Sequence, residues 1–362
     1  MDKLRAQLPG SKLRGAIVLF WIVGLLVDFS ALHARPRKQS HRRQPAQPIE
    51  QGPSALDVQV RLDQASFSPG EIDGKWGANI RKAIAAFQKS RGLKVTGTLD
   101  SATQQALSNS APGETLVPYT ITEQDVAGPF LDRIPRDLVN QSKFPGLYYT
   151  SPLEKLGEKF HISPLLLRQL NKGAKFVAGE QIKAPNLSTA QNPESGSLLS
   201  ASTNGNSASK PAAQAQARRA EMNARPDVTV TVSKNESALR VETADGKIIF
   251  YAPVTSGSLH DPLPLGKWKV TGVQKNPVFH YNPNLFWDAK PKQKRADIQP
   301  GPNNPVGVVW IDINKEHYGI HGTPEPAQIG HTQSHGCVRL TNWDAMKLAA
   351  LVKPGTPVFF VE

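Results

Sequence analysis

The chain has 362 residues, of which 39% are hydrophobic and 7% aromatic. This length is too great for one ordinary domain and suits two or three. The formal net charge is +13, but residues 1–43 alone, with nine basic and two acidic side chains, supply +7, while residues 227–362 supply only +2. A nucleic-acid-binding protein concentrates basic residues on a folded domain, so this distribution excludes that class and indicates a solvated basic tail.

The N-terminus has the order of an export signal. Basic residues precede an uncharged apolar run from Ala16 to Val27, and small residues follow as far as Ala34. We expect residues 1–34 to be a signal peptide or an uncleaved membrane tether, and residues 35–53, basic and rich in Gln and Pro, to be a flexible tether. The rest of the chain is then expected outside the cytoplasmic membrane, in the periplasm or cell wall.

Residues 54–110 are expected to form a small all-α unit. Ile80, Ile84 and Phe87 recur at helical spacing within 79–90, and a second helix is expected from near Asp100. A unit of about 55 residues has only a marginal core, which favours binding over catalysis. Its stretches 73–77, 84–88 and 92–97 resemble the peptidoglycan-binding domain 1 family, and this resemblance implies attachment to the glycan of the cell wall.

Residues 111–187 are expected to form a small α/β connector. Within it, residues 148–187 are similar to the lysin motif, and the alternative is a connector that does not touch carbohydrate. Residues 188–226 contain almost no large apolar side chain, which predicts a disordered linker between independently folded parts.

Residues 227–362 favour a mainly-β domain, β-sandwich-like with one or two helices. The segment 228–232 alternates with period two, and β-branched or aromatic runs follow at 247–252, 267–273, 306–313 and 356–361. One helix is predicted from about Trp343 to Val352, before Pro354. A domain of this size can hold a cleft.

The candidate chemistry centres on Cys337, the only cysteine, which can form no intramolecular disulfide and is a candidate reactive thiol. A thiol attacks as the thiolate and needs a base or a positive charge nearby. His335 leaves the same face of an extended segment as Cys337, whereas His321 can approach only through the fold. Spacing alone leaves both histidines open as the base.

The neighbouring residues fit acyl transfer better than metal binding. Gly322 and Gly336 permit close approach of a substrate backbone, and Gly336 leaves room for N–H groups to meet an oxyanion. Arg339 can pair with a substrate carboxylate. A zinc site is disfavoured because no second cysteine exists and the Cys and His spacing is unusual. We therefore expect no metal and no other cofactor.

The segment from His321 to Leu340 closely resembles the YkuD-like L,D-transpeptidase catalytic family, and the match extends upstream to 264–268 and 301–305. The resemblance implies that Cys337 is the nucleophile, that His321 is its base and that the Gly322 carbonyl orients His321. It also implies that His335 lines the same catalytic site. Ser334, Gly336 and Arg339 are expected to bind substrate. Some members have Asn where this chain has Arg339.

The function that the resemblance implies is cell-wall biogenesis. The enzyme would form 3→3 cross-links between peptidoglycan stem peptides through a cysteine thioester, contribute to cell shape and be a carbapenem target. Water as acceptor would make it an L,D-carboxypeptidase, a protein lysine would make it a lipoprotein-attaching enzyme, and an inactive wall-binding scaffold is the non-enzymatic alternative. The aromatic stretch 279–298 is expected to be either a lid over the cleft or ordinary hydrophobic cover.

Overall fold

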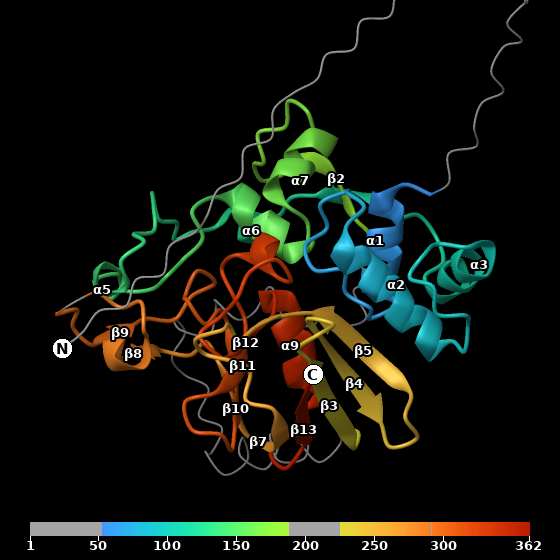
Figure 1. The fold of residues 1–362 in the computed structure, drawn as a ribbon. Coiled ribbons are helices and arrows are strands. Elements are labelled where there is room, and N and C mark those ends of the chain that lie inside the picture. Colours follow the sequence, from blue (N-terminus) through green and yellow to red (C-terminus); the bar gives the residue numbers. More distant parts are fainter. Residues whose placement is uncertain (1–52, 188–224, 291) are drawn as a thin grey trace, which may run out of the picture. The chain divides into compact units, whose positions relative to one another are not determined.

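The computed structural model describes residues 53–187 and 225–362, except residue 291 (Figure 1). The predicted signal segment, nearly all of the predicted tether and nearly all of the predicted linker lie outside the described residues. Within the described ranges, no helix is both long and apolar enough to cross a membrane.

The N-terminal region contains three helices, α1 (Ala55–Gln64), α2 (Ala78–Ser90) and α3 (Ser101–Ser110). Two of them begin at side-chain caps, because Ser54 accepts a hydrogen bond from the N–H of Asp57 and Asp100 accepts one from the N–H of Thr103. The apolar stripe that predicted α2 is buried. The expected small all-α region is therefore confirmed.

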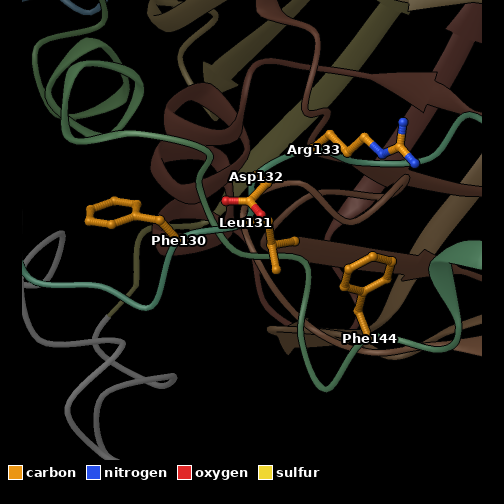
Figure 2. Close-up of a pocket in the computed structure, with 5 residues that line it drawn as sticks. All are labelled: Phe130, Leu131, Asp132, Arg133 and Phe144. Atoms are coloured by element: carbon orange, nitrogen blue, oxygen red, sulfur yellow. The ribbon is translucent and has the colours of Figure 1, made fainter.

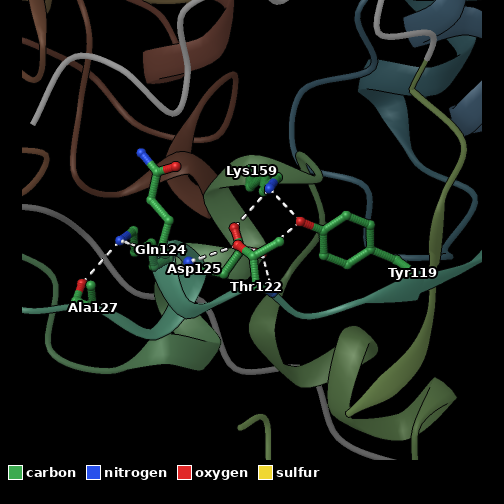
Figure 3. Close-up of polar contacts among 7 residues, drawn as sticks. Tyr119, Thr122, Gln124, Asp125, Ala127 and Lys159 are labelled. Carbon is green, nitrogen blue, oxygen red and sulfur yellow. Dashed lines mark hydrogen bonds and ion pairs between the residues drawn. The ribbon is translucent and has the colours of Figure 1, made fainter. Parts of the chain in front are cut away.

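The connector consists of β1 (Leu116–Thr120), α4 (Glu123–Val126), α5 (Leu138–Gln141), α6 (Pro152–Lys159), α7 (Pro164–Leu170) and β2 (Gln181–Pro185). β1 and β2 pair antiparallel, so β1, α6, α7 and β2 form a strand–helix–helix–strand unit. Its first strand lies upstream of residue 148, and residues 121–151 are inserted between β1 and α6. In Figure 3, Lys159 links β1 to α4, since its Nζ lies 2.6 Å from the Tyr119 hydroxyl and 2.7 Å from Asp125 Oδ1. The α/β character is confirmed, and glycan binding by this unit stays a prediction.

The C-terminal region is dominated by one nine-stranded mixed sheet, as expected for a mainly-β domain. Its order is β5-β4-β3-β13-β7-β10-β11-β12-β6, and the pairs β3–β13 and β11–β12 are parallel. The strands are β3 (Val228–Ser233), β4 (Ala238–Thr243), β5 (Ile248–Pro253), β6 (Thr255–Ser256), β7 (Gly266–Lys275), β10 (Val309–Ile313), β11 (Gly319–His321), β12 (Val338–Arg339) and β13 (Pro357–Val361). A separate hairpin pairs β8 (Phe279–Tyr281) with β9 (Ala296–Ile298).

One helix, α9 (Asn342–Leu351), packs into the core of this sheet (Figure 1). Its N-cap is Thr341, whose side chain accepts from the N–H of Asp344. Ala345 and Leu348 of α9 share one buried cluster with residues from both halves of the sheet, such as Val230 and Val338. The helix follows β12 directly, so this packing also fixes the end of the segment that contains Cys337.

The hydrophobic cores cross the expected domain boundaries. Phe87 and Ile84 of α2 lie in one buried cluster with Ile248 and Tyr251 of β5. The backbone of the N-terminal region also extends the sheet edge, since the N–H of Ser68 donates to Tyr251 O (2.8 Å). A second cluster joins the connector to the β8–β9 hairpin, through Leu147, Tyr281 and Ile298. The N-terminal region is thus packed onto the mainly-β region, which contradicts the expectation of independently folded parts.

Buried polar contacts join the same regions. Asp63 of α1 lies 2.8 Å from the Nζ of Lys347 on α9 and 2.9 Å from the Nδ1 of His161 in the connector. The ring of His161 stacks on Trp343 of α9, with 4.9 Å between ring centroids. The neighbouring cations hold the pKa of Asp63 well below its ordinary value although burial alone would raise it. One carboxylate therefore connects all three regions.

Candidate active site

The register of two short parallel strands brings the predicted catalytic residues together. Ile320 of β11 lies opposite Val338 of β12, and His321 lies opposite Arg339. Ile320 and Val338 point into the core, where both are almost fully buried. Because side chains alternate along a strand, His321, Cys337 and Arg339 share the opposite face.

The same register limits the separation of Cys337 and His321. Cys337 directly precedes β12, so continuing this register by one residue places it opposite Gly319, with whose backbone it forms a hydrogen bond. Strand spacing of about 4.8 Å and a rise of about 3.3 Å per residue place the two Cα atoms about 8 Å apart. Side chains on one face reach each other over that distance, so the fold supplies the approach that spacing could not predict.

His321 is buried and held in one tautomer. Its Nδ1 lies 2.7 Å from the carbonyl oxygen of Gly322, which can only accept, so Nδ1 carries the proton and Nε2 is left as the basic nitrogen. The ring stacks on Trp310 with 5.3 Å between ring centroids. Burial, followed by the positive charge of Arg339, lowers the pKa of His321 to about 3. The imidazole is therefore a neutral base at neutral pH.

Cys337 is half-buried, and its Sγ lies 3.7 Å from the carbonyl oxygen of His317. Burial raises the pKa of Cys337, while the backbone hydrogen bond with Gly319 and the charge of Arg339 act in the opposite direction. The thiol of Cys337 and the imidazole of His321 are thus both neutral at neutral pH.

The turn before Cys337 is held by Ser334, whose side chain is buried. The Ser334 hydroxyl donates to the carbonyl oxygen of Cys337 (2.6 Å) and accepts from the N–H of Gly257 (2.8 Å). Gly336 has φ +100°, and a Cβ there would lie 2.5 Å from the ring of Tyr318. Only glycine fits this position, so the Ser334 and Gly336 positions shape the turn that presents the thiol.

His335 faces the β8–β9 segment. Its Nε2 lies 2.8 Å from Asp288 Oδ1, and its ring contacts those of Phe286 and Trp287, with centroids 5.0 and 6.0 Å away. Among the described residues, His335 makes no hydrogen bond to Cys337. The aromatic stretch that the sequence singled out therefore contacts the catalytic box through this histidine.

Arg339 has an unpaired donor at the site. Its side chain is half-buried, and its buried Nε has no hydrogen-bond partner among the described residues. Burial lowers the pKa of Arg339, while the nearby groups Cys337, Glu325 and Asp288 act in the opposite direction. This guanidinium is available to an anionic group of a substrate.

Asn342, the first residue of α9, contacts the backbone around the site. Its Oδ1 accepts from the N–H of Val308 (3.1 Å), and its Nδ2 donates to Pro302 O (3.1 Å). Its Oδ1 also occupies the space that a Cβ on Gly322 or Gly307 would need. Asn342 thereby supports the backbone that orients His321, and no local sequence signal indicates this.

Two hollows among the described residues lie elsewhere. Figure 2 shows the first, of about 360 Å³, lined by Phe130, Leu131, Asp132, Arg133 and Phe144 of the connector. The second, of about 590 Å³, is lined by the neighbouring 133–144 segment. No predicted catalytic residue borders either hollow. The parts of the chain that the structure describes contain no cluster of three metal-ligating side chains.

Comparison with known proteins agrees with this geometry. Residues 227–360 match the YkuD family model, described as the L,D-transpeptidase catalytic domain, and residues 51–107 match a model for a peptidoglycan-binding domain. A Bacillus licheniformis protein named as an L,D-transpeptidase, YkuD, is 48% identical over 60 residues, which are 17% of this chain and 36% of that protein. The Bacillus subtilis protein YqjB, also named as an L,D-transpeptidase, is 29% identical over 142 residues, which are 38% of this chain and 72% of YqjB.

Solved structures of L,D-transpeptidases are similar over a little more than a third of the chain. L,D-transpeptidase 3 from Mycobacterium tuberculosis, in complex with a faropenem-derived adduct, has 19% identity and a TM-score of 0.32, covering 38% of this chain and 61% of that one. An L,D-transpeptidase from Mycobacterium smegmatis has 17% identity and a TM-score of 0.31, covering 37% and 58%. The chain spans little more than a third of the length of the YkuD relatives. The resemblances of two parts of the chain are confirmed: residues 227–360 match the YkuD family of L,D-transpeptidase catalytic domains, and residues 51–107 match a peptidoglycan-binding domain.

Proposed function

We propose that the chain is an exported peptidoglycan L,D-transpeptidase that acts through a thioester on Cys337. The observation that carries this proposal is the common face of Cys337 and His321, with His321 Nδ1 committed to the Gly322 carbonyl. This arrangement leaves the basic Nε2 for the thiol proton. Its site of action would be the cell wall or periplasm, where the substrate of both domains lies.

The acylation step follows from these positions. As Cys337 Sγ attacks the carbonyl carbon that precedes the terminal D-Ala of a tetrapeptide stem, His321 Nε2 takes the thiol proton. The C–N bond then breaks, and the departing D-Ala amine receives that proton from His321. The thioester that remains is attacked by an amine of a neighbouring stem, whose proton passes to His321. This releases the 3→3 cross-link and restores the thiol.

The electrostatics suit a base that acts only during attack. With a pKa of about 3, His321 is unprotonated at neutral pH, so its Nε2 is free to receive the thiol proton during attack. A buried imidazolium is unfavourable beside Arg339, which favours rapid return of the proton to the leaving amine. A pre-formed thiolate–imidazolium pair is therefore not part of this mechanism.

The other predicted site residues are assigned either to contact with the substrate or to support of the site's backbone. Arg339, with its unpaired Nε, is assigned to a carboxylate of the stem peptide. Gly336 gives room for backbone N–H groups beside the oxyanion. Ser334 is assigned to support, because its hydroxyl is fully engaged by backbone atoms. His335 is assigned to the contact with the β8–β9 segment through Asp288.

The experiment that tests the proposal is mass spectrometry of products from the purified chain and a disaccharide-tetrapeptide. A cross-linked dimer lacking one D-Ala supports transpeptidation. A disaccharide-tripeptide alone would identify an L,D-carboxypeptidase, and transfer only to a lysine of an added protein would identify an attaching enzyme. Unchanged substrate with the native chain, equal to that with Cys337→Ala, would support the scaffold alternative and refute the proposal.

A further inference from the structure

The loop between His321 and the Ser334–Cys337 turn is held on one side by its own domain. The side-chain oxygen of Thr255, on β6, accepts from the N–H of Gly330 (3.1 Å) and donates to the carbonyl oxygen of Gln328 (3.3 Å). β6 also pairs with β12, so this contact ties the loop to the strand that follows Cys337. The position of the loop thus affects both His321, which precedes it, and Cys337, which follows it.

The other side of the same loop is held by the peptidoglycan-binding region. Asn79, in the first turn of α2, donates from Nδ2 to the carbonyl oxygen of Ile329 (2.9 Å). Ile329 is almost fully buried, and Gly330, the next residue, turns the chain with φ +80°. A Cβ on Gly330 would lie 2.5 Å from Asn79 Oδ1. The two residues therefore fit each other closely.

The contact includes a buried polar atom that packing alone would not require. Asn79 Oδ1 is buried and has no hydrogen-bond partner among the described residues. Such an oxygen is unfavourable, and an apolar side chain would avoid this cost. The amide is explained by its Nδ2 group, which donates a hydrogen bond to the carbonyl oxygen of Ile329.

The same region also contacts the downstream side of the Cys337 strand. Ser68 donates from Oγ to Asp344 Oδ2 (2.7 Å), at the first turn of α9. Thr341, two residues after β12, donates to the same oxygen (2.7 Å). The peptidoglycan-binding region thus holds the chain both before and after Cys337.

We propose that Asn79 of the peptidoglycan-binding region is a positioning residue of the transpeptidase site, which holds the loop joining His321 to the Cys337 turn. This inference rests on the proposed function, and it makes the wall-binding region part of the catalytic framework as well as an anchor. It acts through the backbone of Ile329 and Gly330 and does not require Asn79 to touch substrate.

The test compares Asn79→Ala and Asn79→Asp with the native full-length chain. Asn79→Asp keeps the shape but loses the N–H donor, and Asn109→Ala, an exposed asparagine on α3, is the matched control. We measure the rate constant and apparent affinity of acylation by a carbapenem, pelleting with sacculi, the thermal midpoint and the iodoacetamide alkylation of the single thiol against pH. Both Asn79 variants should acylate about tenfold or more slowly, with apparent affinity and sacculus binding unchanged, because small displacements of reacting groups are costly.

A double-mutant cycle provides a second readout. Gly330→Ala should slow acylation in the native background and slow it less in the Asn79→Ala background, where the overlap with Oδ1 is removed. Strictly additive effects would refute direct coupling between the two residues.

Several outcomes overturn the proposal. One is an acylation rate within about twofold of native in either Asn79 variant. Another is an equal decrease in acylation rate in Asn109→Ala. A third is a decrease in sacculus binding as large as the decrease in acylation rate. If the native chain forms no carbapenem adduct, the proposed function fails, and alkylation still decides the role of Asn79. An alkylation profile unchanged by Asn79→Ala would then refute positioning, whereas a changed profile would support it.

Discussion

Removing residues 53–187 should destabilise the transpeptidase domain and not merely detach it from the wall. Ile248 and Tyr251 are buried in a cluster formed largely by α1–α3, and Trp343 stacks on His161 of the connector. Each large side chain that returns to water costs about 1.5–3 kcal/mol, so these three together cost about 5–9 kcal/mol. Domains of this size have a free energy of unfolding of about 5–15 kcal/mol, so the loss is a large fraction of the total.

The measurement compares the fragments 53–362 and 225–362 by thermal denaturation and by carbapenem acylation. A loss of about 5 kcal/mol should lower the thermal midpoint of the shorter fragment by at least about 15 °C. Mixing it with a separately prepared 53–187 fragment should restore part of the acylation, because the shared cores would drive the two pieces together. A midpoint and an acylation rate equal to those of 53–362 would refute the reasoning.

Three further outcomes are expected from single substitutions. Cys337→Ala should abolish the carbapenem adduct in intact-protein mass spectra with little change in the thermal midpoint, and an adduct that persisted would exclude Cys337 as the acylated residue. His321→Ala should slow acylation about 10²–10⁴-fold, whereas His335→Ala should slow it much less; the reverse order would show that the two histidines are misassigned. Asp63→Asn should cost about 3–5 kcal/mol in urea denaturation, because its partners are left unpaired; a cost no greater than that of the exposed control Asp132→Asn would refute this.

The local chemistry of the site was predictable because it depends on short stretches of sequence. The box around Cys337 and the capped helix that follows it can be read from neighbouring residues. Period-two alternation likewise indicated the strand at 228–233, and a run of β-branched and aromatic residues indicated the strand at 357–361. What could not be predicted is which strands pair, since β1 and β2 are separated by about 60 residues of other structure.

The contacts between regions were beyond prediction for a related reason. Ile248 and Tyr251 look like ordinary residues of a strand, and nothing near them indicates that α2 covers them. The composition of 188–226 describes only that segment and does not reveal whether the regions on either side share a core. Asn79 and Asn342 are equally inconspicuous, because each acts on backbone atoms far away in sequence.

The last prediction concerns the pH dependence that Arg339 imposes on the catalytic pair. Burial is the main cause of the low pKa of His321 and raises the pKa of Cys337. The positive charge of Arg339 disfavours protonation of His321 and favours ionisation of Cys337, so it lowers the pKa of both. An ordinary histidine would lose its basic form below a pH of about 6.5. With a pKa of about 3, His321 should keep acylation nearly independent of pH down to about pH 4, provided that the chain remains folded.

Arg339→Gln tests the sign of this effect as well as its existence. Without the positive charge, the pKa of His321 should rise, and the acid limb of the acylation rate should move to higher pH. The pKa of Cys337 should rise too, so iodoacetamide alkylation should also shift to higher pH. Lys269→Gln, which removes a positive charge from an exposed position on β7, is the control and should move neither limb. If the two limbs moved in opposite directions, the sign of the effect would be wrong. If neither limb moved and only the apparent affinity for substrate changed, Arg339 would act on the substrate carboxylate and not on the catalytic pair.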